Sequence, residues 1–315
     1  MYLKIDYTEI KINQQRVCDL MDKNKIKGIL LTTIGAACWG LSGSVGQYLF
    51  DVQMMDSRWL VPIRLGLSGV LILLYSLIKY PDSVFLPWKS KEKAITMLIY
   101  GLAGVSACQF LYFLTIELST AAIGTIMQDL APIFILGYTC ITAKRFPKVL
   151  EILSIIMALL GVFFLTSHGN ITTMTVPLLA LITGVLSAVC VMIYNVLAPK
   201  LTNDIPVIVA QGWSFLLGGI CIGILFRTWT IHYIPNLYGI IGIIFVIVVG
   251  NLCAFTLYIS GVKLIGPSKA ILYSFAEPLT AAVISTLVLG SAFTAFDALG
   301  FAMIFIMLWL ITVSK

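Results

Sequence analysis

Residues 104–132, GVSACQFLYFLTIELSTAAIGTIMQDLAP, decide the fold, because residues 250–278, GNLCAFTLYISGVKLIGPSKAILYSFAEP, align with them without a gap. Five residue types recur at matching places in the two stretches. The matched pairs are Gly104 and Gly250, Leu111 and Leu257, Tyr112 and Tyr258, Leu118 and Leu264, and Pro132 and Pro278. Self-similarity at a fixed offset indicates an internal repeat. We therefore expect two copies of one structural unit in the chain.

The composition around these stretches is typical of a polytopic membrane protein. The chain is 60% hydrophobic and only 11% charged, whereas soluble domains carry about 25% charged residues. A membrane-spanning helix needs about 20 mostly apolar residues. Ten such runs are present, at 27–47, 58–79, 94–115, 120–141, 148–167, 175–197, 205–226, 237–259, 267–289 and 294–313. The predicted fold class is all-α, with ten transmembrane helices.

The positive charges predict how the spans are oriented. Lysine and arginine concentrate on the cytoplasmic side of membrane proteins, and here the N-terminal segment and every second connection are basic. The alternate connections contain only Arg58 and Arg227. Ten spans with both termini in the cytoplasm fit this pattern. The net charge of +6 is thereby explained without a nucleic-acid partner, and none is expected.

The repeats predict the division of the chain. Residues 1–26 are polar, lack the features of a signal peptide and are expected to form an N-terminal cytoplasmic tail, with Met21 as an alternative natural start. The repeats then cover 27–167 and 175–313. Because each holds five spans, an odd number, the second must be inverted relative to the first. Inverted repeats are typical of secondary transporters, whose substrate site lies near the midplane between broken helices.

Two prolines and two acids mark this midplane. Pro132 and Pro278 lie near the centres of the fourth and ninth spans and are predicted to break them, with an ordinary kink as the alternative. Asp129 and Glu277 lie about ten residues into the same spans, roughly 15 Å deep. A carboxylate facing lipid there costs at least ~2.5–3.5 kcal/mol, so both are expected to face the protein interior.

The acids have two interpretations each. In the first, they bind protons or a cationic substrate directly; in the second, internal hydrogen bonds hold them at the proline breaks. Under the repeat alignment Glu277 matches Ala131 and Asp129 matches Phe275, which places the acids about 200° apart around a helix. The sequence therefore does not predict that they share one pocket.

Other polar and aromatic residues within the spans are candidate ligands of the substrate. Arg64, about 9 Å deep at a rise of ~1.5 Å per residue, is predicted to snorkel to the outer headgroups, to pack within the protein or to pair with a buried acid. An amphipathic pocket that holds an organic cation over aromatic faces would draw on Trp39, Gln128, Tyr112, Tyr258 and Asn251. Simple helix packing is the alternative for each of them. Gly40, Gly43 and Gly46 form a strip for close packing or for cavity lining.

Four stretches carry a family resemblance: ACWGLSGSV (37–45), VPIRLGLSGVL (61–71), LSTAAIGTIMQDLAPIF (118–134) and GPSKAILYSFAEPLTAAVISTLVLG (266–290). Through them the chain resembles the drug/metabolite transporter superfamily, in its ten-span branch with two EamA-type repeats, over about 27–313. The resemblance implies transport of amino acids, other small metabolites, cations or drugs, often outward. The family often has an acid at the end of the fourth and ninth spans, where this chain reads TAKRF (142–146) and LGSAF (289–293). Asp129 is not a general feature of the family pattern.

The functional hypothesis is a secondary transporter, more specifically an exporter, of a small amphipathic metabolite such as an amino acid or organic cation. It would work by alternating access, coupled to protons or to exchange, in a bacterial inner membrane, and a homodimer is compatible with it. A membrane-embedded transferase and a passive channel are the alternatives. No enzyme activity, cofactor or metal is expected, because the chain lacks a phosphate-binding loop and a nucleophile with a paired base. Its seven cysteines are scattered without a CxxC pair and are expected to pack as small hydrophobic residues between helices. Its two histidines fall in predicted loops.

Overall fold

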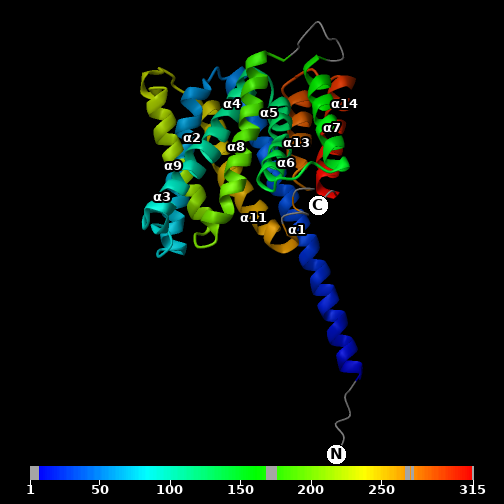
Figure 1. The fold of residues 1–315 in the computed structure, drawn as a ribbon. Helices are drawn as coiled ribbons and strands as arrows, with labels where there is room; N and C mark the ends of the chain where they lie inside the picture. Colours follow the sequence, from blue (N-terminus) through cyan, green and yellow to red (C-terminus); the bar gives the residue numbers. More distant parts are fainter. Residues whose placement is uncertain (1–6, 168–175, 267–269, 271–272, 314–315) are drawn as a thin grey trace, which may run out of the picture.

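The part of the chain that the computed structural model describes is all-helical, and its helices run side by side in one bundle (Figure 1). Described are residues 7–167, 176–266, 270 and 273–313, with side chains from residue 23 onward. Nine helices in these ranges are long and apolar enough to cross a membrane. A tenth apolar helix, α13 (Ala276–Leu287), is shorter. The protein is thus a polytopic, all-α membrane protein.

The helices follow the ten predicted apolar runs. Six runs are single helices: α1 (Tyr7–Asp51), α2 (Ser57–Lys79), α7 (Val149–Ser167), α8 (Leu178–Thr202), α9 (Val207–Leu225) and α14 (Ala295–Val313). The ninth run, 267–289, contains α13, and its residues 267–269 and 271–272 lie outside the described residues. The helix α1 begins well before residue 27, so it includes most of the expected N-terminal tail. Figure 1 shows this part of α1 projecting from one end of the bundle.

The third and eighth spans share an unusual construction. The third consists of α3 (Lys91–Leu98), the π-helical segment η2 (Ile99–Ser106) and α4 (Ala107–Leu118). The eighth consists of α10 (Leu237–Phe245), the π-helical segment η4 (Val246–Cys253) and α11 (Ala254–Ile265). A π-helical segment is rare, so its presence at equivalent places of both spans supports the repeat seen in the sequence.

The packing of the helices repeats in the same way. α1 packs against α11 and α13, and its counterpart α8 packs against α4 and against the two halves of the fourth span, α5 (Ala121–Gln128) and α6 (Ala131–Thr142). The counterparts α2 and α9 pack against each other, as do α7 and α14. Two five-helix units therefore exchange equivalent contacts.

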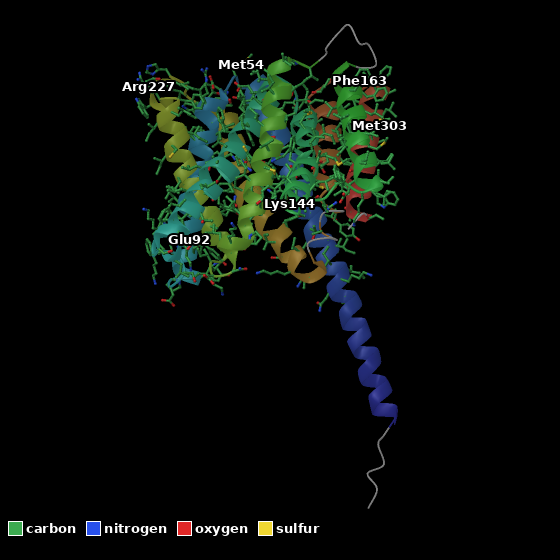
Figure 2. The ribbon with its side chains drawn as sticks, in the orientation of Figure 1. Met54, Glu92, Lys144, Phe163, Arg227 and Met303 are labelled. Atoms are coloured by element: carbon green, nitrogen blue, oxygen red, sulfur yellow. The ribbon has the colours of Figure 1, made fainter. Side chains whose placement is uncertain are left out.

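The two units cross the bundle in opposite directions. In Figure 2, Met54 and Arg227 lie at one end of the bundle, and Glu92 lies at the other. α1 enters at the end where Glu92 lies, whereas Phe163, near the end of α7, lies at the opposite end (Figure 2). α14 then runs back, because the C-terminus is marked on the side from which α1 entered (Figure 1). Because each half crosses the bundle five times, an odd number, the second half begins at the opposite end of the bundle from the first.

Glycines bring the paired helices into backbone contact. A Cβ on Gly69 of α2 would overlap the backbone nitrogen of Leu216 on α9, whereas a Cβ on Gly66 would meet no atom within 4 Å. Between α7 and α14, a Cβ on Gly161 would lie 3.0 Å from the carbonyl oxygen of Gly300. Small residues at helix crossings allow such close approach, which in lipid replaces the hydrophobic effect as a source of association.

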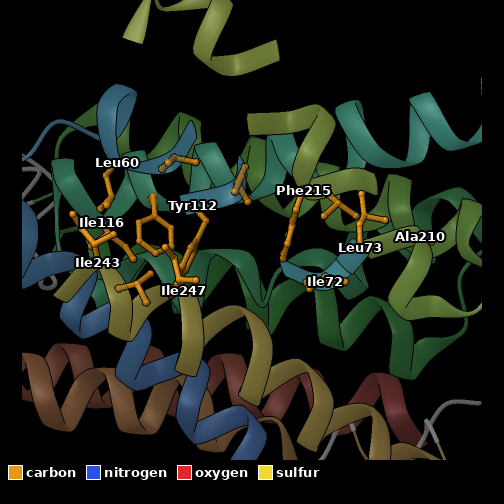
Figure 3. Close-up of a cluster of buried hydrophobic side chains, with 14 of the residues drawn as sticks. Leu60, Ile72, Leu73, Tyr112, Ile116, Ala210, Phe215, Ile243 and Ile247 are labelled. Carbon is orange, nitrogen blue, oxygen red and sulfur yellow. The ribbon is translucent and has the colours of Figure 1, made fainter. Parts of the chain in front are cut away.

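A buried apolar cluster surrounds the tyrosine of the third span. In Figure 3 the ring of Tyr112 lies beside Ile116 of the same helix and near Leu60, Ile243 and Ile247 from α2, α10 and η4. Residues of both repeats therefore pack around the side chain of Tyr112. The position of Tyr112 is therefore fixed by packing rather than by hydrogen bonds.

Buried Gln47 joins three spans near one end of the bundle. Its Oε1 accepts hydrogen bonds from the backbone N–H of Ala121 at 2.9 Å and from Oγ of Ser285 at 2.8 Å. Its Nε2 donates to Ser291 Oγ and to Asp51 Oδ2. Because Gln47 is 2% exposed and both groups of its amide are hydrogen-bonded, it ties α1, α5 and α13 together at the end where α5 begins.

Candidate functional site

A helix break accompanies each mid-membrane acid. In the fourth span α5 ends at Gln128, Asp129 and Leu130 form a turn, and α6 begins at Ala131, with Pro132 in its first turn. Proline suits the start of a helix, because its missing N–H would have no partner there. In the ninth span a turn at Ser274 and Phe275 precedes α13, whose first turn holds Glu277 and Pro278. Each repeat thus contributes one broken helix with an acid at the break.

The two acids lie within electrostatic reach of each other. Asp129 contributes to the electrostatic environment of Glu277, although the repeat alignment does not predict a shared pocket. Both residues are half-buried, and no lysine or arginine of the described chain forms a salt bridge with either of them. Oδ2 of Asp129 is buried and has no hydrogen-bond partner among the described residues. We refer to Asp129 and Glu277 as the acid pair.

Side chains of α4 and α5 border the acid pair. Cys108 and Tyr112 lie four residues apart, on one face of α4, and both interact electrostatically with Glu277. Gln128 donates a hydrogen bond from Nε2 to Sγ of Cys108, at 2.8 Å. Gln128 therefore faces α4 and contacts the thiol.

Two further tyrosines also lie within the electrostatic reach of Glu277. Tyr258 of α11 interacts with Glu277 and Asp129, and Tyr194 of α8 interacts with Glu277 and Tyr258. The ring of Trp39, on α1, lies 5.0 Å from that of Tyr258, centroid to centroid, and both residues are half-buried. Aromatic rings from helices of both repeats thus surround the acid pair.

Arg64 packs inside the bundle, which is one of the three interpretations that the sequence allows for it. The residue is 3% exposed, which excludes snorkelling to the headgroups, and within the described chain it pairs with no acid. Its Nη2 donates instead to Oε1 of Gln109 and to Oδ1 of Asn251, the latter at 2.8 Å. Asn251 in turn donates from Nδ2 to Oγ of Ser68, at 2.7 Å. The carbon Cζ of Arg64 lies 4.0 Å from the ring centroid of Phe113, a cation–π contact.

Unpartnered buried atoms gather between Arg64 and the acid pair. Within the described part of the chain they include Nε and Nη1 of Arg64, Oη of Tyr112 and Oδ2 of Asp129. Tyr112 lies within electrostatic reach of Arg64 and of both acids. Buried polar atoms in native proteins nearly always have a partner, and exceptions mark sites of water, ions or function. This cluster is the candidate site.

The glycine strip of α1 packs closely against this region. A Cβ on Gly40 would overlap the carbonyl oxygen of Glu277, and one on Gly43 would lie 2.5 Å from Oη of Tyr112. A Cβ on Gly46 would lie 2.7 Å from Cε1 of Phe113. Of the two interpretations of the strip, close packing is therefore confirmed, and it brings α1 against both broken-helix and α4 residues of the site.

The sequence did not single out three residues of the site. The sequence pattern indicates only packing for Cys108, as for the other cysteines, and it gives no functional signal for Phe113 or Ser68. Cys108 is detectable in retrospect, because it lies one helical turn before Tyr112 on the same face. No such signal marks Phe113 or Ser68, since their role depends on where Arg64 and Asn251 lie in space. Two cysteines also differ from the packing expectation, because Cys221 and Cys253 are exposed.

The described residues contain no group of three or more His, Cys, Asp or Glu side chains that could hold a metal ion. The six described cysteines, Cys38, Cys108, Cys140, Cys190, Cys221 and Cys253, are free thiols. The acid pair itself provides only two carboxylates. Two carboxylates can bind protons or a positively charged group.

Comparisons with known proteins agree with this fold. The EamA-like transporter family model matches residues 26–167 and again residues 178–313. A protein of Salmonella typhimurium, described as the uncharacterized inner membrane transporter YicL, is 33% identical over 274 residues, which cover 87% of this chain and 91% of the relative. The crystal structure of another protein matches this fold with a TM-score of 0.62 and 13% sequence identity, and the match covers 93% of this chain and 97% of the other protein's chain. At that identity the structural likeness concerns the fold alone.

Proposed function

The chain belongs to the EamA-like transporter family, and from this membership we propose that it is a secondary transporter, working as an exporter, of a small amphipathic metabolite such as an amino acid or organic cation. Transport proceeds by alternating access, in exchange for protons or for a second solute. The protein carries out no chemical conversion. Asp129 and Glu277 bind the proton or the positively charged group of the substrate.

The observation that carries this proposal is the acid pair, which forms no salt bridge with a lysine or arginine among the described residues. Two carboxylates that lie close together inside a bilayer repel each other, and burial disfavours the charged form of each. They are neutralised either by protons or by a cation that enters the site. A site that accepts one or the other, but not both at full occupancy, couples the movement of the two.

The two repeats supply the moving parts in this proposal. Residues 27–167 and 175–313 rock against each other around the acid pair, as inverted repeats do in other transporters. The basic connections support an orientation with both termini in the cytoplasm, in a bacterial inner membrane. Arg58, one of the two arginines on the outer side, donates to Asp56, and this hydrogen bond is the main cause of the lowered pKa of that carboxyl. The outer side therefore keeps little net positive charge.

Purified protein in proteoliposomes tests the proposal. Vesicles loaded with unlabelled amino acids or organic cations are diluted into the radiolabelled solute, and a pH gradient is imposed in a second series. We expect saturable counterflow of at least one solute and acceleration by the pH gradient. Uptake no faster than in empty vesicles for every solute would contradict transport. Uptake that does not saturate and shows no counterflow would favour a passive channel instead.

Asp129→Asn is expected to flatten the pH dependence of transport. The substitution retains the size of the side chain but removes the proton that Oδ2 gains and loses, so the exchange rate should vary less than about threefold between pH 5.5 and 8.5. A wild-type protein that uses this proton should vary about tenfold or more, because the ratio of the protonated to the ionised form of a single group changes tenfold per pH unit. Counterflow at several pH values measures both profiles. An unchanged profile and unchanged apparent affinity in the variant would assign the proton to another group.

A further inference from the structure

The two halves of the broken fourth span differ in how tightly they are packed. Every residue of α5 from Ala121 to Met127 is buried. In α6 the buried residues are Ala131, Leu136 and Cys140, and the other residues of that helix are half-buried or exposed. Figure 1 shows α5 toward the end of the bundle opposite to the projecting part of α1. In the orientation proposed above, the tightly packed half is therefore the outer one.

One amide joins the helices of this outer half. Oε1 of Gln47 accepts hydrogen bonds from the backbone N–H of Ala121, the first residue of α5, and from Oγ of Ser285 on α13, at 2.9 and 2.8 Å. Nε2 of the same side chain donates to Oγ of Ser291, just beyond α13, and to Oδ2 of Asp51. Because α5 belongs to the first repeat and α13 to the second, a single side chain of α1 connects the outer parts of both broken spans.

The contact between α1 and α13 runs from the acid pair to this amide. A Cβ on Gly40 would overlap the carbonyl oxygen of Glu277, and Gln47, two turns further along α1, bonds to Ser285. Residue numbers thus rise together along the contact, so both helices run outward. Ser44 lies between the two points, donates a hydrogen bond to the carbonyl oxygen of Gly40 and is buried, as is Gln47. Gln47 therefore closes the bundle on the outer side of Glu277.

We propose that Gln47, through its hydrogen bonds to Ala121 and Ser285, is the outer gate of the transporter and releases both partners when the path from the acid pair opens outward. This inference rests on the proposed transport function and assigns the residue that controls one of its two openings.

Neutral hydrogen bonds suit such a gate. Each contributes modestly because water competes for the same groups, so the two bonds that join the spans favour the closed state by roughly tenfold. In the open state water replaces Ala121 and Ser285 as partners, and the amide of Gln47 is not left unpaired. The breaks in the fourth and ninth spans allow α5 and α13 to tilt without moving the inner halves of their spans.

Thiol labelling tests the gate without a transport measurement. In a full-length chain whose native cysteines are replaced by alanine or serine, Ser44→Cys places a thiol one turn inside the gate. A membrane-impermeant maleimide is applied from the outside to right-side-out vesicles. We expect slow labelling while Gln47 is present and labelling about tenfold faster when Gln47→Leu is added, because leucine has a similar size but cannot accept the two hydrogen bonds. Gln47→Asn, whose shorter side chain cannot reach both partners, serves if Gln47→Leu does not fold.

The matched control is Gln53→Leu. Gln53 lies just beyond the outer end of α1, is half-buried and donates from Nε2 to Oη of Tyr48, at 2.8 Å. Its loss removes the same amide from the same end of the bundle, so labelling at Ser44→Cys should stay within about twofold. Labelling of inside-out vesicles provides a second control, because an outer gate changes access from the outside, whereas a general loosening of the bundle changes access from both sides.

A reversible cross-link tests the gate in the transport cycle. The backbone nitrogen of Ala121 and Oγ of Ser285 bond to the same oxygen, so Ala121→Cys and Ser285→Cys together place two thiols across the gate. Molecular oxygen, with copper phenanthroline as catalyst, takes up the two electrons and two protons that leave when the disulfide forms. Counterflow in proteoliposomes should fall at least tenfold on oxidation and return when dithiothreitol reduces the bond.

The outcomes separate this inference from the proposed function. Equal labelling at Ser44→Cys with and without Gln47 overturns the gate, and so does an equal rise in Gln53→Leu or from the inner side. Undiminished counterflow by the cross-linked protein also overturns it. Outside labelling that depends on Gln47, in a protein without counterflow of any solute, would retain the gate and contradict transport.

Discussion

Glu277→Gln is expected to lower the transport rate roughly 100-fold while the protein remains folded and inserted. The change retains the shape of the side chain and its place in the first turn of α13 but removes the charge that receives the proton or the ammonium group. Hydrogen bonds to charged groups are worth about 1.5–3 kcal/mol, and each ~1.4 kcal/mol is a factor of ten. Initial rates of counterflow in proteoliposomes, at equal amounts of reconstituted protein, measure the effect.

The matched control is Glu92→Gln. Glu92 lies in the first turn of α3, exposed at one end of the bundle and remote from the acid pair. This variant loses the same charge from the same residue type, so its transport should stay within about twofold of the wild type, as expected of exposed substitutions. Normal transport by Glu277→Gln would reduce Glu277 to a structural role at the break before Pro278.

Gly69→Ala is expected to destabilise the protein by about 1–3 kcal/mol or more, whereas Gly66→Ala, one turn away on the same helix, is expected to be tolerated. The added methyl group on Gly69 overlaps the backbone of Leu216, so α2 and α9 must separate, and overpacking of a tight interface has costs of this order. At Gly66 a methyl group meets no atom within 4 Å, and alanine is the better helix former by roughly 1 kcal/mol. Melting temperatures in one detergent compare the two variants.

Because both variants make the same chemical change, differences in detergent binding or expression host cancel between them. Similar melting temperatures for the two would mean that the crossing of α2 and α9 is looser than the structure has it. A lowered melting temperature for Gly66→Ala alone would contradict the assignment of the close contact to Gly69. The crossing joins equivalent helices of the two repeats, so the result also measures how firmly the halves hold each other.

Most of the fold was predictable because membrane insertion follows simple physical rules. Apolar runs of about 20 residues give the helices, and an odd number of spans per repeat gives the inversion. The prolines indicated where the fourth and ninth spans break, since proline cannot continue the hydrogen-bond pattern of a helix. The extent of α1 was not predictable, because hydropathy detects the apolar part of a helix and not its polar continuation.

The arrangement within the site was less predictable, because it depends on how helices pack. Asp129 and Glu277 occupy different positions in their repeats, and only the breaks beside them allow the two side chains to come together. The sequence allowed Arg64 to reach the lipid headgroups, to pack within the protein or to pair with an acid, but it did not predict its partners, which are the amides of Gln109 on α4 and Asn251 on η4. Which polar side chains meet across three helices is decided by crossing angles that no local pattern encodes.

The π-helical segments η2 and η4 give the third and eighth spans wide turns, which contain one residue more than an α-helical turn. If a wide turn lost its extra residue, the helix beyond it would rotate by about 100°, the angle of one residue in an α-helix. Tyr112 and Tyr258 lie just beyond these wide turns, on α4 and α11. Such a change of register in either span would rotate its tyrosine around the helix axis without bending the rest of the helix. The same construction therefore occurs twice, once in each of the two oppositely oriented repeats.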